Sequence, residues 1–91
     1  MTPEFDFAPS FQKKYEKLKP NIKEGVTTAL KKFKKNPEAA ALRLHRLSDV
    51  EPPIWKIDVF PDRSWQIAMR IEGNLCTLLR VGTHKEMDRA Y

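Results

Sequence analysis

The feature that most constrains the fold is a series of three strand-length segments in the second half of the chain, separated only by short turns. Apolar and polar side chains alternate in residues 54–60 and 64–71, as in strands with one buried face. Residues 75–81 are nearly all apolar, which is typical of a central strand. Pro-Asp at 61–62 and Gly-Asn at 73–74 supply the turns. Such short connections favour an antiparallel meander.

Two amphipathic helices are predicted before these strands. Ser10 is a suitable N-cap for a helix that begins at Phe11 and continues one apolar stripe through Tyr15 and Leu18. Pro20 ends this helix and suits the first turn of the next one. The second helix has a single apolar face, formed by Ile22, Val26, Ala29, Leu30 and Phe33. Two helices that each carry one apolar stripe require a surface to cover, and the predicted sheet supplies it.

Two shorter strands and a short C-terminal helical turn complete the predicted elements. Phe5 and Phe7 alternate with acidic residues near the N-terminus, and leucines alternate through the sequence LRLHRL before the meander. Residues 85–91 are expected to form the helical turn. The chain has the length of one domain, so residues 1–91 are assigned to a single domain. The prediction is an α+β fold in which a helical hairpin packs on one face of a mainly antiparallel sheet of four or five strands.

The opposite face of the predicted sheet is polar and mostly cationic. Alternation from the apolar positions places on this face Lys56, Asp58, Gln66, Arg70 and Arg80. Because the helices cover the other face, we expect the functional site on the polar one.

Positive charge is concentrated in one part of the chain. Residues 10–36 contain nine lysines and two glutamates, whereas acidic residues slightly outnumber basic ones in the remainder. A local excess of cations attracts polyanions such as RNA, DNA, the ribosome or an acidic protein segment. A solvated lysine face without a partner is the plainer interpretation of the same run.

The composition excludes several classes of protein. The single cysteine, Cys76, excludes an intrachain disulfide and a cysteine-based zinc site, and it suits a reduced, cytoplasmic location. The N-terminal residues lack the basic and apolar regions of a signal peptide, and no apolar run approaches the roughly 20 residues that cross a membrane. Two histidines without a carboxylate cluster make a poor metal site, so we expect neither a metal nor another cofactor.

At LRLHRL, WKIDVFPDRSWQIAMRI and LLRVGTH the chain resembles the RelE/ParE toxin superfamily, and within it the YafQ branch most. The resemblance covers nearly the whole chain. The YafQ branch has a histidine before the sheet, an aromatic residue at the start of the penultimate strand and a Gly-Thr-His after the last strand. These features are matched here by His45, Trp65 and His84. The RelE branch has a basic residue on the first long strand and a C-terminal tyrosine, matched by Lys56 and Tyr91.

The chain departs from these patterns in three places. Ser64 stands where the YafQ pattern has an aspartate before the tryptophan, and the further histidine of that pattern near Phe60 is absent. Arg63 matches the arginine of the RelE branch only if the turn at residues 61–62 shifts register. These departures concern the catalytic residues rather than the fold.

The resemblance implies a toxin of a type II toxin–antitoxin pair that cleaves mRNA on the ribosome, with ribosome, mRNA and a cognate antitoxin as partners and no membrane. Cleavage of RNA without a metal turns its 2′-OH onto the adjacent phosphate, which requires a base, an acid and cations. Histidine suits both proton roles because its pKa is about 6.5. We therefore predict His45 as the base or a phosphate partner and His84 as the acid, and we expect both to line one groove.

The remaining candidate residues are assigned from the same resemblance and from their charge or aromatic character. Arg63 and Tyr91 are further catalytic candidates. Cations suit the phosphates and aromatic rings suit an unstacked base. The residues expected to bind RNA are Lys56, Trp65, Arg70, Arg80, Lys31, Lys32, Lys34 and Lys35.

Two other functions stay open at this point. A ParE-like inhibitor of DNA gyrase has the same layout but lacks the paired histidines, so these histidines favour the nuclease. A catalytically inactive module would be retained for antitoxin binding or for autoregulation on DNA. Ordinary structural roles also stay open for single residues, since Trp65 fits the inward stripe of its strand and the charged strand residues suit a solvated face.

Overall fold

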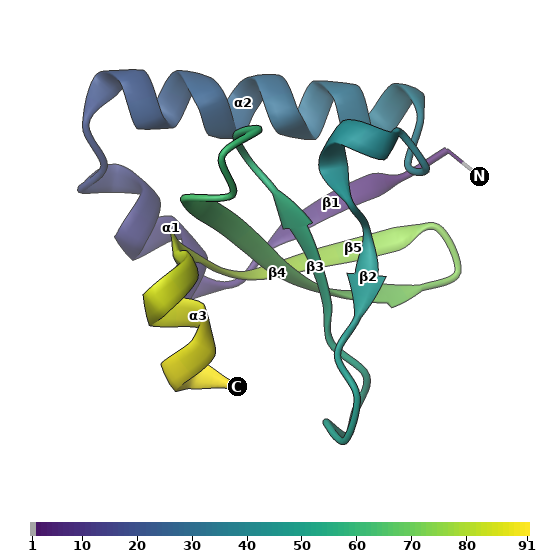
Figure 1. Ribbon diagram of the computed structural model, residues 1–91. Helices are drawn as coiled ribbons and strands as arrows, with labels where there is room; N and C mark the ends of the chain where they lie inside the picture. Colours follow the sequence, from purple (N-terminus) through teal and green to yellow (C-terminus); the bar gives the residue numbers. More distant parts are fainter. Residues whose placement is uncertain (1) are drawn as a thin grey trace.

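The computed structural model describes residues 2–91, in which three α-helices and five strands form an α+β arrangement (Figure 1). The elements in chain order are β1 (Glu4–Phe7), α1 (Pro9–Glu16), α2 (Pro20–Lys35), a 3-10 turn (Ala40–Leu42), β2 (His45–Arg46), β3 (Trp55–Asp58), β4 (Trp65–Glu72), β5 (Leu75–Thr83) and α3 (His84–Ala90).

The strands form one sheet in the order β1-β5-β4-β3-β2. β1 runs parallel to β5, and the other neighbouring pairs are antiparallel. The α1–α2 hairpin leads from β1 at one edge of the sheet back to the 3-10 turn that precedes β2 at the other edge (Figure 1). The predicted fold, a helical hairpin on a mainly antiparallel sheet, is therefore confirmed, as is the meander of the last three strands.

The main core lies between the sheet and the helical hairpin. Val26, Ala29 and Phe33 form the buried stripe of α2 at the spacing that the sequence predicts. The alternating positions of β4 and its neighbours supply the other half of this core, together with residues from α1 and the 3-10 turn. Its fully buried sheet residues are Ile57, Ile67, Met69, Cys76, Leu78 and Val81.

A second, smaller core lies on the other face of the sheet and is covered by α3. Met87 of α3 is 2% exposed and packs with Ile54 and Ala68. A capping box starts this helix: Thr83 Oγ1 accepts from the Glu86 amide at 3.2 Å, and Glu86 Oε1 accepts from the Thr83 amide at 2.9 Å. The predicted C-terminal helical turn is therefore a seven-residue helix that closes over part of the polar face.

The prediction that Ser10 caps the first helix is wrong. α1 begins at Pro9, two residues before the predicted start at Phe11, and Ala8 is its N-cap. Proline suits this first position because its missing N–H has no partner inside the helix in any case. The Ser10 hydroxyl instead donates to the Leu79 carbonyl at 2.6 Å and so joins α1 to β5.

The predicted strand through LRLHRL is also too long. Only His45 and Arg46 pair with β3, and a 3-10 turn precedes them. Arg43 separates the two elements because its backbone is left-handed, with φ 47° and ψ 50°. This conformation reverses the chain direction and ends the alternation that the leucines suggested.

β3 ends at Asp58, two residues before the predicted end of the strand. The chain then leaves the sheet, and the β3–β4 loop extends toward α2 (Figure 1). The Phe60 ring lies against the backbone of Gly25 in α2. A Cβ atom placed on Gly25 would lie 2.3 Å from Phe60 Cζ, so this helix position has no room for a side chain while the ring stays in place.

Gly25→Ala is expected to destabilise the protein by about 1–3 kcal/mol, because the new methyl group displaces the Phe60 ring. The same change at an unhindered helix position stabilises by about 0.5–1 kcal/mol. The matched control is Gly25→Ala in a Phe60→Ala background, where it should be stabilising. Urea unfolding of the four variants measures both effects, and equal stabilisation in the two backgrounds would contradict the packing described here.

Candidate functional site

A row of side chains crosses the sheet on the face opposite α1 and α2. The register pairs His45 of β2 with Lys56 of β3, and Lys56 in turn with Ala68 of β4. Ala68 pairs with Arg80 of β5. Directly opposed residues point to the same face, and neighbouring strands lie about 4.8 Å apart. These four residues are called the cationic row, in which the small Ala68 leaves space between two cations.

Lys56 is nearly buried in this row, with 6% exposure. The prediction that Lys56 and Asp58 point to the polar face is consistent with the register, and the alternative of a solvated role does not hold for these two residues because both are buried. The β2–β3 connector and α3 rise around Lys56 and enclose a pocket of about 330 Å³ whose lining includes Ser48, Met87 and Tyr91. Within residues 2–91, no carboxylate lies within 4.0 Å of the Lys56 ammonium.

Tyr91 connects the two cations of the row. Its ring lines the pocket that holds Lys56, and its centre lies 6.0 Å from the Arg80 guanidinium carbon, within cation–π range. Arg70 lies on the same face, two residues beyond Ala68 on β4. The structure thus brings together four of the residues that the sequence predicts for RNA contact or catalysis: Lys56, Arg70, Arg80 and Tyr91.

His45 is half-buried at the edge of the row, beside Lys56. Its Nδ1 lies 2.6 Å from the carbonyl oxygen of Arg43. A carbonyl oxygen only accepts hydrogen bonds, so Nδ1 carries the proton of the neutral ring. The second nitrogen, Nε2, is then unprotonated and is the nitrogen that can take a proton from a ligand.

The Asp58 carboxylate joins β3, β4 and Arg43, which lies two residues before His45. Asp58 is 2% exposed, accepts from Arg43 Nε at 2.5 Å and accepts from Gln66 Nε2 at 3.0 Å. Burial alone would raise the pKa of Asp58, but the hydrogen bonds from Arg43 and Gln66 outweigh it and hold the pKa below its ordinary value. The carboxylate is therefore charged at neutral pH despite its burial.

His84 lies at the first position of α3, where its side chain is 49% exposed. Its Nε2 lies 3.4 Å from the Asp88 carboxylate one turn later. β2 and β5 are three strand spacings apart, and His84 follows Arg80 by four residues, which places the His45 and His84 Cα atoms about 20 Å apart. The structure therefore does not bring the two imidazoles together in one groove, because β2 and β5 are not neighbours.

Trp65 lies near the end of β5 that carries His84. The register pairs Trp65 with Thr83, and the His84 amide donates to the Ser64 carbonyl at 3.0 Å. The Trp65 side chain is half-buried, packs against the main core and also lines a groove of about 470 Å³ together with Lys14, Lys17 and Lys19. Trp65 therefore packs against the core and also presents part of its ring to the groove, where a ligand could contact it.

Arg63 lies outside the cationic row. It is exposed in the β3–β4 loop, where its backbone is left-handed at φ 63° and its amide donates to the Phe60 carbonyl at 2.9 Å. The hairpin turn does not shift register in the way that would place Arg63 on the sheet.

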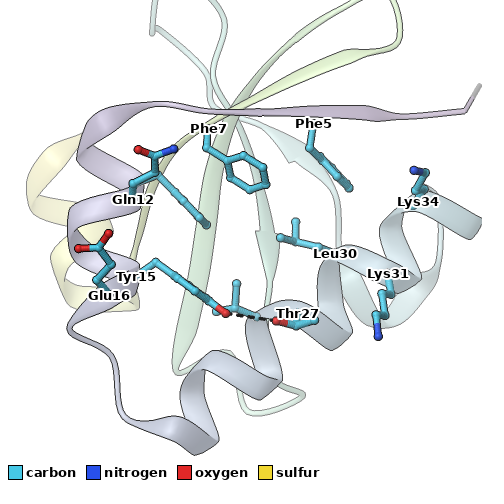
Figure 2. Close-up of a pocket in the computed structure, with 11 residues that line it drawn as sticks. Phe5, Phe7, Gln12, Tyr15, Glu16, Thr27, Leu30, Lys31 and Lys34 are labelled. Atoms are coloured by element: carbon cyan, nitrogen blue, oxygen red, sulfur yellow. Dashed lines mark hydrogen bonds between the residues drawn. The ribbon is translucent and has the colours of Figure 1, made fainter.

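The lysines of α2 lie on the other side of the sheet from the cationic row. Lys31, Lys32, Lys34 and Lys35 are all exposed. Lys31 and Lys34 border a groove of about 630 Å³ between α1, α2 and β1 (Figure 2). The predicted RNA-binding residues therefore fall on two separate surfaces.

The groove between the hairpin and β1 is mainly apolar. Phe5 and Phe7 project from β1 toward Leu30 of α2, and Tyr15 of α1 closes the other end with its hydroxyl 3.4 Å from Thr27 Oγ1 (Figure 2). Phe7 is 43% exposed, which is unusual for a phenylalanine on a sheet edge. This surface has the apolar centre and cationic border of a binding site for a protein segment.

Two further findings concern the described part of the chain. In residues 2–91, no three His, Cys, Asp or Glu side chains gather as they would around a metal ion. None of the helices in these residues combines the length and the apolar character needed to cross a membrane.

The sequence matches no family model. It also matches no curated protein. Solved structures do match. E. coli RelE in the free state, as a double mutant, superimposes with a TM-score of 0.72 at 18% identity over 97% of this chain and 90% of RelE. A chain of the RelE–RelB complex from Pyrococcus horikoshii gives a TM-score of 0.70 at 8% identity, over 91% of this chain and 96% of that one. A chain of the E. coli DinJ–YafQ toxin–antitoxin complex gives a TM-score of 0.64 at 17% identity, over 96% of this chain and 98% of that one.

The chain has the RelE-type toxin fold. The agreement extends over nearly the full length of both chains. The resemblance inferred from the sequence motifs is thereby confirmed at the level of the fold.

Sequence reasoning missed one residue of this candidate site. Arg43 is absent from the predicted set, although its carbonyl accepts from His45 and its side chain binds the buried Asp58. The sequence holds only a weak signal for it, an arginine two residues before the candidate histidine and a lone acid on the next strand. The left-handed backbone that turns both groups of Arg43 inward is visible only in the structure.

The attachment of α3 to the site is expected to weaken in acid. The Lys14 ammonium, 2.8 Å from Glu86, and the Thr83 amide lower the pKa of Glu86 to about 2. Because this folded-state pKa is depressed, the stabilisation is complete above the ordinary pKa of about 4.5 and is lost as the pH falls toward 2. The pair is surface-exposed, so the effect should stay below about 1 kcal/mol.

Glu86→Gln tests this pH dependence, because its amide oxygen still accepts from Thr83 but carries no charge. Urea unfolding of both proteins should give a stability difference that shrinks from about pH 5 to about pH 2. A difference that stays constant over this interval would show that the Glu86 charge does not hold α3.

Proposed function

We propose that this protein is the toxin of a type II toxin–antitoxin pair and that it cleaves mRNA on the ribosome, in the bacterial cytoplasm. The observation that carries the proposal is the cationic row, in which a histidine whose Nδ1 lies against a carbonyl oxygen is next to a nearly buried lysine, with an arginine and a tyrosine on the same face. The resemblance to the RelE and YafQ branches supports RNA as the substrate, since the resemblance implies mRNA cleavage.

The row holds the groups that cleavage of RNA by its own 2′-OH requires. The 2′-oxygen attacks the adjacent phosphorus while His45 Nε2 takes the hydroxyl proton. Lys56 and Arg80 stabilise the charge that develops on the phosphorane oxygens. The bond to the 5′-oxygen then breaks, and this oxygen takes a proton from the Tyr91 hydroxyl or the Lys56 ammonium. The products are a 2′,3′-cyclic phosphate and a 5′-hydroxyl.

His84 is assigned to RNA binding rather than to the same phosphate as His45. It lies beside Trp65 at the far end of β5, about 20 Å from His45 by the strand spacing. A nucleotide of RNA spans roughly 6 Å, so the two ends contact different nucleotides of one strand. Trp65 lies at the same end of the sheet but on its helix side, where its face in the groove beside α1 can stack a base, and Arg63 in the adjoining β3–β4 loop is assigned to the RNA backbone.

The lysines of α2 are assigned to ribosomal RNA. They face away from the cationic row, so a strand bound at the row does not use them. A surface with many exposed lysines on one helix gives affinity without sequence specificity, which suits an interaction with a large folded RNA.

The apolar groove of Figure 2 is assigned to the antitoxin. The matched RelE and YafQ structures include complexes with RelB and DinJ antitoxins. Here the groove offers Phe5, Phe7 and Leu30 as apolar contacts, with Lys31 and Lys34 at its border. The occupant that fits is an amphipathic antitoxin segment with acidic residues flanking its apolar side chains.

His45→Ala is expected to reduce mRNA cleavage by about 10²–10⁴-fold, because it removes the base. His84→Ala, the matched change at the other histidine, should reduce cleavage less, because it removes a contact to a flanking nucleotide. Primer-extension mapping of transcripts after induction measures both effects. Cuts in phase with the reading frame would show that the wild-type protein acts during translation.

The two other candidate functions give different results in the same experiment. If induction causes DNA breaks while transcripts stay intact, the protein is a gyrase inhibitor rather than a nuclease. If high levels of folded protein cause no growth arrest and no transcript cleavage, the protein is a catalytically inactive antitoxin-binding module. Complete loss of cleavage in His84→Ala with activity retained in His45→Ala would contradict the assignment of the row.

Phe7→Glu is expected to weaken antitoxin binding at least about 10-fold, because the charge must be buried in an apolar contact. Leu75→Glu is the matched control: Leu75 is 39% exposed, close to the 43% of Phe7, but it does not line the groove. Titration calorimetry with the purified antitoxin measures both affinities. Equal losses in the two variants, or none in Phe7→Glu, would place the antitoxin elsewhere.

A further inference from the structure

The Asp58 carboxylate is held by three hydrogen bonds at the edge of the cationic row. It accepts from Arg43 Nε at 2.5 Å, from Arg43 Nη2 at 3.5 Å and from Gln66 Nε2 at 3.0 Å. Asp58 pairs with Gln66 in the β3–β4 register, so both side chains project from the same face of the sheet. The carboxylate is therefore a fixed point, buried to 2% exposure and tied to two strands.

Arg43 reaches this fixed point from a strained backbone position. Its φ of 47° lies in the left-handed region, which an arginine rarely adopts without a compensating interaction. The Arg43 amide donates to the Ala40 carbonyl at 3.2 Å and closes the 3-10 turn. The side chain and the carbonyl of this single residue thus point to Asp58 and to His45 respectively.

Building on the proposed function, we propose that the Arg43–Asp58 ion pair is a positioning device for the base: it holds the Arg43 carbonyl against His45 Nδ1 and so keeps the free lone pair of His45 on Nε2. The carbonyl is 2.6 Å from Nδ1, and the ring can satisfy it only in the tautomer with the proton on Nδ1. Arg43 and Asp58 do not touch RNA in this arrangement. They act on the reaction through the orientation and tautomer of the imidazole.

The proposed positioning role of the Arg43–Asp58 pair differs from that of an ion pair that only stabilises the fold. An ion pair that only stabilises can be lost without changing which nitrogen of a nearby histidine is protonated. Loss of the Arg43–Asp58 pair frees the left-handed residue to relax, which moves its carbonyl away from His45. The ring is then free to place its proton on Nε2, where it blocks the nitrogen that faces the ligand.

The tautomer of His45 is measured directly by ¹⁵N NMR of the imidazole nitrogens, at about pH 8, where an unperturbed ring is neutral. Wild-type His45 is expected to show a protonated Nδ1. His84 is an internal reference, because its Nε2 faces the Asp88 carboxylate and should carry the proton. In Arg43→Gln and in Asp58→Asn the His45 signals should shift toward the Nε2-protonated form, with those of His84 unchanged.

Cleavage kinetics complete the test. Removal of a partner that orients a functional histidine typically costs about 10–100-fold, so kcat should fall by this factor in both variants while KM changes little. Arg43→Lys, which keeps the charge but loses the two-pronged contact, should restore part of the wild-type tautomer population and of kcat. If circular dichroism shows that Arg43→Gln or Asp58→Asn does not fold, the His45 tautomer and kcat of Arg43→Lys are compared with those of the wild type instead.

The outcomes separate the two proposals. An unchanged His45 tautomer in folded Arg43→Gln and Asp58→Asn overturns the positioning role, whatever happens to cleavage. A shifted tautomer together with a fall in kcat supports it. A wild-type protein that cleaves no RNA, with the Nδ1-protonated ring intact, overturns the proposed function and leaves the positioning geometry standing.

Discussion

The pairing of β4 with β5 supports every other part of the molecule. These two strands are matched along the whole of β4, and within residues 2–91 they are the only helices or strands that contribute to both cores. On one face they carry Ile67 and Leu78 toward the helical hairpin, and on the other Ala68 and Leu79 toward α3. Neither the hairpin nor α3 has another apolar surface to cover, so each depends on the same strand pair.

The cationic row depends on this pair as well. Lys56 and His45 join the row through β3 and β2, which are added to the outer edge of β4. Burial of Lys56 then follows from α3, which lies over β4 and β5 and closes the pocket with Met87 and Tyr91. Desolvation strengthens the attraction of this ammonium for a phosphate, because water no longer competes for it. The fold thus partly shields the Lys56 ammonium from water while leaving it at the edge of a pocket.

Much of the fold was predictable because its signals are local. The 3.6-residue stripe of α2 and the alternation in β4 each identify an element without knowledge of the rest, and the short turns between the last strands determine their antiparallel pairing. The wrong predictions arise where tertiary contacts override local pattern. β3 stops early because Phe60 turns away to pack on Gly25, and the LRLHRL strand is cut short by the left-handed Arg43.

The candidate site was predictable in its residue types but not in its grouping. Lys56, Arg80 and Tyr91 were expected on functional grounds, and the structure brings them together. The distance between His45 and His84 depends on the strand order, and the predicted meander gives this order for β3, β4 and β5 but leaves the place of β2 open. For the same reason, the link from Asp58 through Arg43 to His45 has no counterpart in any single motif.

One residue of β5 decides on which side of the sheet Arg80 lies. The β4–β5 register changes between Ala68 and Met69, where β5 carries one residue more than β4, at Leu79. With strict alternation from the core residue Leu78, position 80 would face the helices and position 81 would face outward. The extra residue inverts this alternation. Val81 therefore points into the main hydrophobic core, and the Arg80 side chain points to the opposite face beside Ala68. Had Leu79 kept regular pairing instead of forming this bulge, the same sequence would turn the positive charge of Arg80 inward.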